Sequence, residues 1–381
     1  MRIGLVTGEY PPMEGGIGAH CRELAREMTH QGHSVFVYSD SRSEEANSQV
    51  ALTHNQGGWG IGALRSINRW ASDNKLDIVN LHYQTAAFQM SPFVHWLPDA
   101  VKVPVITTFH DLRFPYLFPK AGRLRDWTVM RLARASEGVI STNHEDFARL
   151  KSHHRAALIP IGSSVKTDLP PDFDRPRWRD SLGASETDYV VAHFGFINHT
   201  KGVDTLLRAA RTLLDQALPV RVWLVGGRTG ASDPTNAQFA NAVQDLAVHL
   251  DLTDRVVWTG FLGDSEAAAC FAACDVVALL YSDGASYRRS SLMAAIAQGA
   301  AIMTTEPAVA IPAFRDGMNM RLISPADVQS AAGALSEMWL NPVLRSRLRV
   351  GARELAGEFT WPEIARSNVE HFSQIVAEAR R

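Results

Sequence analysis

The sequence predicts an α/β fold with two successive doubly wound domains, each built on a parallel sheet that helices cover on both faces. Three observations favour this fold. The 381 residues suffice for about two domains. Short, almost continuous apolar runs alternate with helical patterns along the whole chain, as expected for parallel strands that are buried on both faces. A polar, proline-rich segment over 166–188, without periodicity, divides these runs into two sets and is predicted as the linker.

Each set contains five predicted strands. In the first half they are IGLVTG, SVFVYS, DIVNLH, VPVITTF and GVIST, and in the second half DYVVAHFGF, VRVWLVGG, RVVWTG, DVVALLY and AAIMTT. The first helix is predicted from Ile17, Cys21, Leu24 and Met28, whose spacings of four, three and four residues place them on one face. We therefore expect one domain over residues 1–168 and a second over 186–359.

Composition and charge exclude several classes of protein. The 38 basic and 40 acidic residues give a formal net charge of −2, so dedicated binding to nucleic acid is not expected. Three cysteines cannot form a disulfide framework, and Cys270 and Cys274 are expected as small buried side chains rather than metal ligands. The sequence shows no signal-peptide pattern and no apolar run that could span a bilayer, which predicts a cytoplasmic protein.

Loops that follow parallel strands are the expected ligand sites, because helix N-termini meet at the carboxyl edge of such sheets. The loop GEYPPMEGGIGAH places Gly15, Gly16 and Gly18 before the first helix, where backbone N–H groups could approach an anion or simply form a tight turn. The loop GFINHTKGVDTLL places Lys201 at the start of another helix, where it faces an anion or is solvated at the surface.

A third loop, YSDGASYRRSSLMAAIAQG, carries two consecutive arginines just before a predicted helix. Ser290 or Ser291 is the expected N-cap of that helix. Guanidinium groups can bind two phosphate oxygens at once, so Arg288 and Arg289 are predicted to form a phosphate clamp.

The order of several motifs resembles a known family. These motifs are GEYPPMEGGIGAHCRELAREMTHQGHSVFVYS, LDIVNLHY, VPVITTFHD, NHEDFARL, ALIPIGSSV, KGVDTLLRAA, VWLVGG, VVWTGFL and AAIAQGAAIMTT. Together they resemble glycosyltransferase family 4, whose members have the GT-B fold, retain the configuration of the transferred sugar and use nucleotide-sugar donors. The resemblance implies two Rossmann-like domains with an interdomain cleft, the first on the acceptor side, and a C-terminal helix over 360–381 that crosses back onto it.

The resemblance also implies roles for individual residues. Gly15, Gly16 and Lys201 would contact the donor diphosphate. His110, in TFHD, would be catalytic near the acceptor and the reacting carbon of the sugar, with a satisfied histidine in a cleft as the alternative. His82 and Asp111 would lie with it on the acceptor side, although for His82 a purely structural role is the favoured alternative.

The second domain departs from the family pattern. Phe196 stands where most members have an arginine that binds the diphosphate, and Ser286 and Ala294 stand where most have glutamates. Because the diphosphate still needs cations, we predict that one arginine of the pair, with Arg288 slightly favoured, acts as a catalytic residue beside Lys201. The predicted donor-binding set also includes Arg289, Ser290, Ser291 and Asp283, of which Asp283 would accept a hydrogen bond from the donor sugar or be a solvated carboxylate.

The predicted function is a retaining hexosyltransferase that moves a sugar from a nucleotide-diphosphate sugar to a hydroxyl of a glycan, lipid or small molecule. No Asp-x-Asp pair lies at a predicted strand end, so neither a metal nor another cofactor is expected. A non-catalytic GT-B binding protein and a nucleotide-sugar epimerase are the alternatives. The basic stretch over 120–134 could place the protein at the inner face of a membrane, or it could be an ordinary solvated helix.

Overall fold

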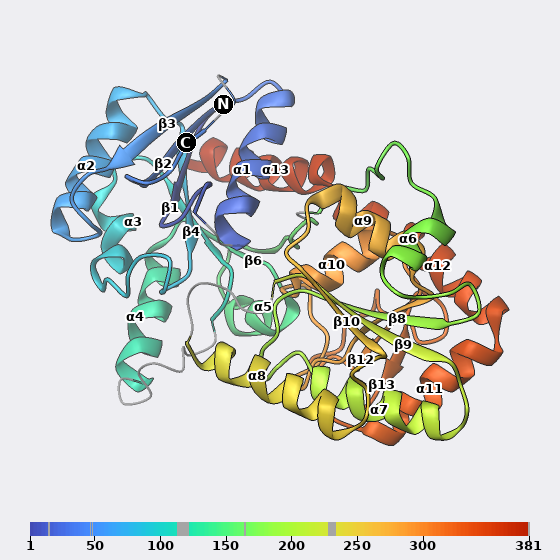
Figure 1. Cartoon of the computed structure of the whole chain (residues 1–381). Helices are drawn as coiled ribbons and strands as arrows, with labels where there is room; N and C mark the ends of the chain where they lie inside the picture. The colour runs from blue at the N-terminus through green and yellow to red at the C-terminus, as the bar shows by residue number, and fades with distance from the viewer. Residues whose placement is uncertain are drawn as a thin grey trace. The chain divides into compact units, whose positions relative to one another are not determined.

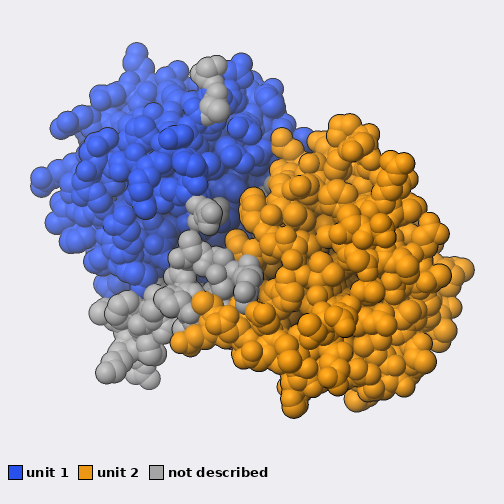
Figure 2. Space-filling model, in the orientation of Figure 1, with its two compact units in different colours: residues 1–164, 360–381 blue, residues 165–359 orange. Residues whose placement is uncertain are grey.

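The computed structural model divides into two compact units (Figures 1 and 2). Unit 1 comprises residues 1–164 with 360–381, and unit 2 comprises residues 165–359. The structure describes residues 1–13, 16–45, 47, 49–112, 122–163, 165–227 and 234–379, without the side chains of 122–125 and 234–236.

Unit 1 is built on a parallel sheet which, in the described part of the chain, has seven strands in the order β3-β2-β1-β4-β5-β6-β7. The strands are β1 (Arg2–Thr7), β2 (Ser34–Asp40), β3 (Val50–Asn55), β4 (Ile78–Tyr83), β5 (Val105–Phe109), β6 (Gly138–Ser141) and β7 (Ala156–Leu158). The helices are α1 (Gly16–His30), α2 (Ile61–Asp73), α3 (Leu97–Ala100), α4 (Gly122–Ala135), α5 (His144–Leu150) and α13 (Trp361–Ala379), with a 3₁₀ turn η1 (Phe93–Trp96).

Unit 2 contains a second parallel sheet, with six strands in the order β10-β9-β8-β11-β12-β13 among its described residues. The strands are β8 (Tyr189–Phe194), β9 (Val220–Val225), β10 (Val256–Gly260), β11 (Val276–Leu279), β12 (Ile302–Thr305) and β13 (Arg321–Ile323). The helices are α6 (Arg175–Ser181), α7 (Val203–Asp215), α8 (Pro234–His249), α9 (Asp264–Ala273), α10 (Ser290–Ala297), α11 (Val328–Leu340) and α12 (Pro342–Ala356), followed by a 3₁₀ turn η3 (Gly357–Phe359).

Each sheet has a point where the order of its strands reverses. In unit 1 this point lies between β1 and β4, where Ile3 pairs with Ile78, and in unit 2 it lies between β8 and β11, where Val191 pairs with Val276. Ligands of doubly wound proteins bind beyond the carboxyl ends of the strands at such a point. The loops that follow these four strands are therefore the candidate sites. The expected fold, with two doubly wound parallel sheets, is confirmed.

The first and last long helices of the chain share one core in unit 1. Ile17, Cys21, Leu24 and Met28 of α1 are all buried, as their helical spacing predicts. Phe372 and Ile375 of α13 belong to the same apolar cluster, so α13 packs beside α1 (Figure 1). The prediction of a C-terminal helix that returns to the first domain is thus confirmed.

The segment predicted as the linker contains a packed helix, α6. The Asp174 side chain caps α6 by accepting a hydrogen bond from the Arg177 N–H. Arg179 is only 1% exposed and donates to the Ala273 carbonyl at 3.0 Å and to Asp275 at 3.2 Å. The prediction of a linker over 166–188 is therefore wrong for α6, because a buried guanidinium rather than an apolar stripe holds it to unit 2.

Three described strands, β3, β7 and β13, were not predicted from the sequence. All three lie at the edges of their sheets. β3 is buried only at its two ends, β7 is half-buried throughout, and β13 is buried only at its last residue. Edge strands of this kind lack the continuous apolar run that identifies a central parallel strand.

Gly202, the N-cap of α7, should be one of the least replaceable residues of unit 2. Its φ is +62°, and a Cβ there would lie 1.8 Å from the carbonyl oxygen of Leu280. We expect Gly202→Ala to lower the free energy of unfolding by at least about 2 kcal/mol, because strain and a backbone clash add. Chemical denaturation measures this loss. Gly183, with φ +69° and open space around it, is the matched control. Equal losses for both alanine variants would contradict the steric argument.

Candidate functional site

In unit 2, the loops that follow β8 and β11 meet at the point where the strand order reverses. The Ser282 N–H donates to the Thr200 carbonyl at 3.1 Å, and Arg289 donates to the Thr200 hydroxyl at 3.3 Å. The Lys201 ammonium donates to the Ser291 hydroxyl, at 3.0 Å, in the first turn of α10. Lysine, arginines and serine thus form one cluster, although they come from separate loops.

Lys201 is packed into this cluster rather than solvated. Its Nζ lies 5.2 Å from the centre of the Tyr281 ring, and the Tyr281 hydroxyl shares the Ser291 hydroxyl with it at 2.7 Å. Burial and, to a smaller extent, the positive charge of Arg289 lower the pKa of Lys201 to about 7, while Asp283 opposes the shift. The alternative of a solvated surface lysine is therefore wrong.

Both predicted arginines are turned inward and share one carboxylate. Their side chains are 10% and 12% exposed, and each forms an ion pair with Asp283. The guanidinium of Arg289 lies 4.6 Å from the centre of the Tyr281 ring, and its Nε is buried without a hydrogen-bond partner among the described residues. Among the described residues, the cluster therefore combines three basic side chains with the carboxylate of Asp283, and it keeps an excess of positive charge whether or not Lys201 is protonated.

The start of α10 differs from the prediction in one detail. Arg289, not Ser290 or Ser291, occupies the N-cap position, and no side chain caps this end. Ser290 is exposed, whereas the Ser291 hydroxyl is used by Lys201 and Tyr281. Because neither serine occupies the N-cap position, the first N–H groups of α10 receive no side-chain cap there, and a helix N-terminus of this kind favours an anion.

At three positions where most family members have charged side chains, the structure places uncharged residues. Phe196 is 44% exposed, and its ring lies against Gly227. Ser286 is 8% exposed and Ala294 is 1% exposed, so neither position offers a carboxylate to a ligand. The charged groups described near these positions are therefore those of the cluster formed by Lys201, Arg288, Arg289 and Asp283.

In unit 1, the loop after β1 leads into the N-terminus of α1. Gly15 lies outside the described residues, and Gly16 is the first residue of α1. A Glu9 oxygen accepts hydrogen bonds from the N–H groups of Ile17 at 3.1 Å and Gly18 at 3.4 Å. Burial raises the pKa of this carboxyl, and the two backbone donors oppose the shift. A carboxylate thus already occupies the position where an anion was predicted.

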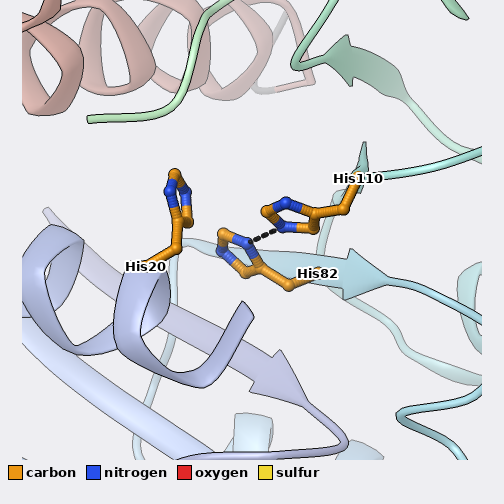
Figure 3. A group of neighbouring side chains, drawn as sticks. All are labelled: His20, His82 and His110. Atoms are coloured by element: carbon orange, nitrogen blue, oxygen red, sulfur yellow. Dashed lines mark hydrogen bonds between the residues drawn. The ribbon is translucent and has the colours of Figure 1, made fainter. Parts of the chain in front are cut away.

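Three histidines meet at the carboxyl ends of β4 and β5 (Figure 3). Nδ1 of His82 and Nε2 of His110 are 3.1 Å apart, and the ring of His20, from α1, lies 5.0 Å from that of His110. Burial holds the pKa of all three imidazoles below the usual range, to about 4 for His20 and well below 6.5 for the others. The structure therefore brings the predicted His82 and His110 together in neutral form, with Asp111 next in the chain.

Comparison with known proteins identifies the family. Residues 14–162 match the family model described as Glycosyltransferase Family 4, and residues 174–355 match that of Glycosyl transferases group 1. A D-inositol 3-phosphate glycosyltransferase from Stackebrandtia nassauensis is 31% identical over 96% of this chain and 89% of its own length. This chain belongs to glycosyltransferase family 4. The prediction of a hexosyltransferase-type enzyme is confirmed, and the alternative of a non-catalytic protein is not supported.

More distant relatives of this family 4 glycosyltransferase agree with its fold. An alpha-monoglucosyldiacylglycerol synthase from Streptococcus pneumoniae is 24% identical over 72% of this chain and 65% of its own length. Among solved structures, a sucrose-phosphate synthase from Thermosynechococcus elongatus superposes with a TM-score of 0.78 at 19% identity and covers 99% of each chain. Anabaena Alr3699/HepE in complex with UDP-glucose superposes with a TM-score of 0.75 at 18% identity over 98% of this chain and all of its own. The predicted GT-B fold is confirmed.

Four residues that contribute to these loops and clusters of the glycosyltransferase were not predicted from the sequence. Glu9, Thr200 and Tyr281 were missed because only tertiary contacts bring them to these loops. His20 was missed although its spacing from the apolar residues of α1 indicates a buried position. It lies three residues after Ile17 and four before Leu24, on the buried face of α1.

The structure describes only part of the basic stretch over 120–134. Lys120 lies outside the described residues, and α4 carries the rest. Arg131 donates to the His95 carbonyl at 2.9 Å and pairs with Asp99, while Trp127 is 52% exposed. Among the described residues of the glycosyltransferase, no helix is both long and apolar enough to cross a membrane.

Proposed function

We propose that this protein is a retaining glycosyltransferase that transfers a sugar from a nucleotide-diphosphate sugar to a hydroxyl of its acceptor without a metal ion. The observation that carries the proposal is the cluster of Lys201, Arg288 and Arg289 at the uncapped start of α10. Three cations and free backbone N–H groups can neutralise a diphosphate leaving group, which is the role that a divalent ion has in other transferases.

The donor diphosphate would replace Asp283 as the partner of the arginines. Arg289 is the better candidate for the main phosphate ligand, because its charge acts on Lys201 and its buried Nε lacks a partner among the described residues. Arg288 and the Ser291 hydroxyl would support it. Asp283, once displaced, and Ser290 are available to donor hydroxyls. The solved complex of Anabaena HepE with UDP-glucose, which shares the fold, supports a nucleotide-sugar donor.

Unit 1 would supply the acceptor side. His110 is neutral and half-buried, so its imidazole can exchange a hydrogen bond with a sugar hydroxyl or with the attacking hydroxyl. His82 forms a hydrogen bond with one ring nitrogen of His110 and so orients its imidazole. Gly16 is the first residue of α1, whose N-terminal N–H groups donate to Glu9. We propose that the bond between the anomeric carbon and the diphosphate oxygen breaks as the acceptor oxygen bonds to the same face of that carbon, and that the proton of the acceptor hydroxyl passes to the departing diphosphate.

The acceptor is proposed only as a hydroxyl of a glycan, a lipid or a small molecule. The names of two relatives mention a monoglucosyldiacylglycerol and a D-inositol 3-phosphate. With a lipid acceptor, the exposed Trp127 and Arg134 of α4 would be suited to the inner surface of an anionic membrane.

A donor screen tests this proposal. The protein is titrated with UDP-, GDP- and ADP-sugars by calorimetry and then incubated with each ligand that binds, while NMR follows the sugar. We expect binding of one donor class, slow release of free nucleotide and an unchanged anomeric configuration in any transferred sugar. A new sugar isomer without nucleotide release would instead support an epimerase, and the absence of binding to every donor would contradict the proposal.

Transfer is expected to survive removal of divalent ions. The cations of unit 2 supply the positive charge that a metal would otherwise bring to the diphosphate. Activity measured after incubation with EDTA should match that of the untreated enzyme. Complete loss that Mg²⁺ or Mn²⁺ restores would show that a metal takes part.

Donor affinity is expected to fall as the pH rises through neutrality. The pKa of Lys201 is about 7 in the free protein, and a diphosphate binds its protonated form. Above that pH, binding must take up a proton, so the association constant should drop by up to about tenfold per pH unit. Calorimetry across a pH series measures the slope. Lys201→Arg, which stays charged, is the control and should flatten the profile. If the association constant falls equally with pH in the wild type and in Lys201→Arg, Lys201 does not bind the diphosphate as proposed.

A further inference from the structure

The histidine cluster of unit 1 is drawn from three separate elements. His20 lies on α1, His82 near the end of β4, and His110 directly after β5 (Figure 3). His20 is 7% exposed and His82 is fully buried, while His110 is half-buried. One nitrogen from each ring can be chosen so that all three lie within 4.8 Å of one another.

The spacing of the rings fits tetrahedral coordination. Zinc binds imidazole nitrogen at about 2.0–2.1 Å, which places each ring centre about 3.2 Å from the metal and any two ring centres about 5.2 Å apart. The observed separations between ring centres are 5.0, 5.4 and 5.5 Å. The two closest nitrogens, Nδ1 of His82 and Nε2 of His110, are 3.1 Å apart, against about 3.3 Å expected for two zinc ligands. A small rotation of His20 toward this pair would complete the set.

Two ring nitrogens of the cluster have no other partner. Nδ1 of His20 and Nε2 of His82 are buried and have no hydrogen-bond partner among the described residues. A histidine gives one ring nitrogen to a metal ion, so a site that uses Nδ1 of His82 leaves its Nε2 outside, and Nδ1 of His20 is the unpartnered atom that can serve as a ligand. Buried polar atoms are normally satisfied, so the unpartnered nitrogen of His20 beside this pair favours a ligand at this place. The imidazoles are also neutral, which leaves their lone pairs available to a metal without the loss of a proton.

We propose that His20, His82 and His110 form a binding site for Zn²⁺ with three imidazole ligands and an open fourth position. A set of three nitrogens and no carboxylate favours zinc and similar transition metals over Mg²⁺ or Ca²⁺. Occupation of the site withdraws the His110 imidazole from the substrate, so Zn²⁺ inhibits transfer. The inhibition rests on the function proposed above for His110, whereas the binding does not.

Direct metal binding is tested on the full chain without any substrate. After treatment with a chelator and its removal, the protein is titrated with Co²⁺ as a spectroscopic probe and then with Zn²⁺ in competition. We expect visible bands of tetrahedral Co²⁺ and one Zn²⁺ that displaces it. His20→Phe should weaken Zn²⁺ binding by more than the roughly 10–100-fold that loss of an outer-shell partner costs.

The controls separate this site from the other histidines of the chain. His30 lies on the same helix with its side chain 66% exposed, and His30→Ala should bind Zn²⁺ as the wild type does. His110→Gln alters a half-buried position and serves as a second variant if His20→Phe does not fold by circular dichroism. The absence of tetrahedral Co²⁺ bands in the wild type would overturn the proposal. So would a Zn²⁺ affinity of His20→Phe and His110→Gln that equals that of the wild type.

Inhibition is measured separately, with the transfer assay. Addition of Zn²⁺ should inhibit the wild type, EDTA should restore it, and His20→Phe should be less sensitive relative to its own zinc-free rate. Zinc binding without inhibition would leave the site in place but would contradict the proposed role of His110.

Discussion

Arg289→Ala is expected to lower kcat/KM by about 10²–10³-fold, because it removes a preorganised cation from the leaving group. The reason is the geometry of the cluster. Arg289 sits at the start of α10, over Tyr281, and its charge acts on Lys201. No arginine at position 196 can compensate for its loss, since Phe196 is there. Initial rates with the donor identified by the screen, measured on folded protein, test the expectation.

Two further variants make this test specific. Arg289→Lys keeps the charge but loses the planar fork, so it should recover only part of the activity. Arg288→Ala removes the neighbouring guanidinium, which pairs with the same Asp283, and its kcat/KM is compared with that of Arg289→Ala. Near-native kcat/KM in both alanine variants would place the phosphate ligand elsewhere, and a greater loss for Arg288→Ala would restore the preference suggested by the sequence.

Acidification is expected to destabilise unit 1 through its buried histidines. The pKa of His20 is lowered from 6.5 to about 4 by burial, so between these pH values the unfolded chain binds a proton that the folded chain does not. Unfolding is therefore favoured as the pH falls, and His20 alone should remove about 3 kcal/mol of stability by the lower end of this range. His82 and His110 shift in the same direction. Thermal unfolding in EDTA across this pH range measures the loss.

A difference between variants isolates the contribution of His20. His193 in unit 2 also has a pKa lowered by burial, to about 3, so the wild type loses stability from more than one site. His20→Gln cannot be protonated and should show a shallower decline, whereas His30→Gln, at an exposed position of the same helix, should follow the wild type. Parallel curves for all three proteins would contradict the assignment.

Regular patterns in the sequence predicted most of the fold. Central strands are buried on both faces and are therefore apolar throughout, and the period of α1 identifies its buried side. Helix α6 was not predicted because a buried arginine, rather than an apolar face, packs it against unit 2. Edge strands such as β3 were not predicted because they are partly exposed.

The candidate site was predictable in its cations but not in their arrangement. Lys201, Arg288 and Arg289 follow from their loops and from the family resemblance. The choice between the two arginines depends on Tyr281 and Thr200, which reach them only through the folded sheet. His20 was overlooked because an imidazole on an apolar helix face is not counted as part of the apolar pattern, although it lies at the right spacing.

The carboxylate of Asp283 pairs with both arginines, and in the proposed mechanism it would make the resting site selective for anions that carry several negative charges. An incoming anion has to displace an internal counter-ion before it can engage the guanidinium groups. A small monovalent anion would exchange one negative charge for another and gain little, whereas a diphosphate brings several charged oxygens to the arginines and to Lys201 at once. After transfer, the same carboxylate competes again for its old partners, and this return would assist the departure of the nucleotide product.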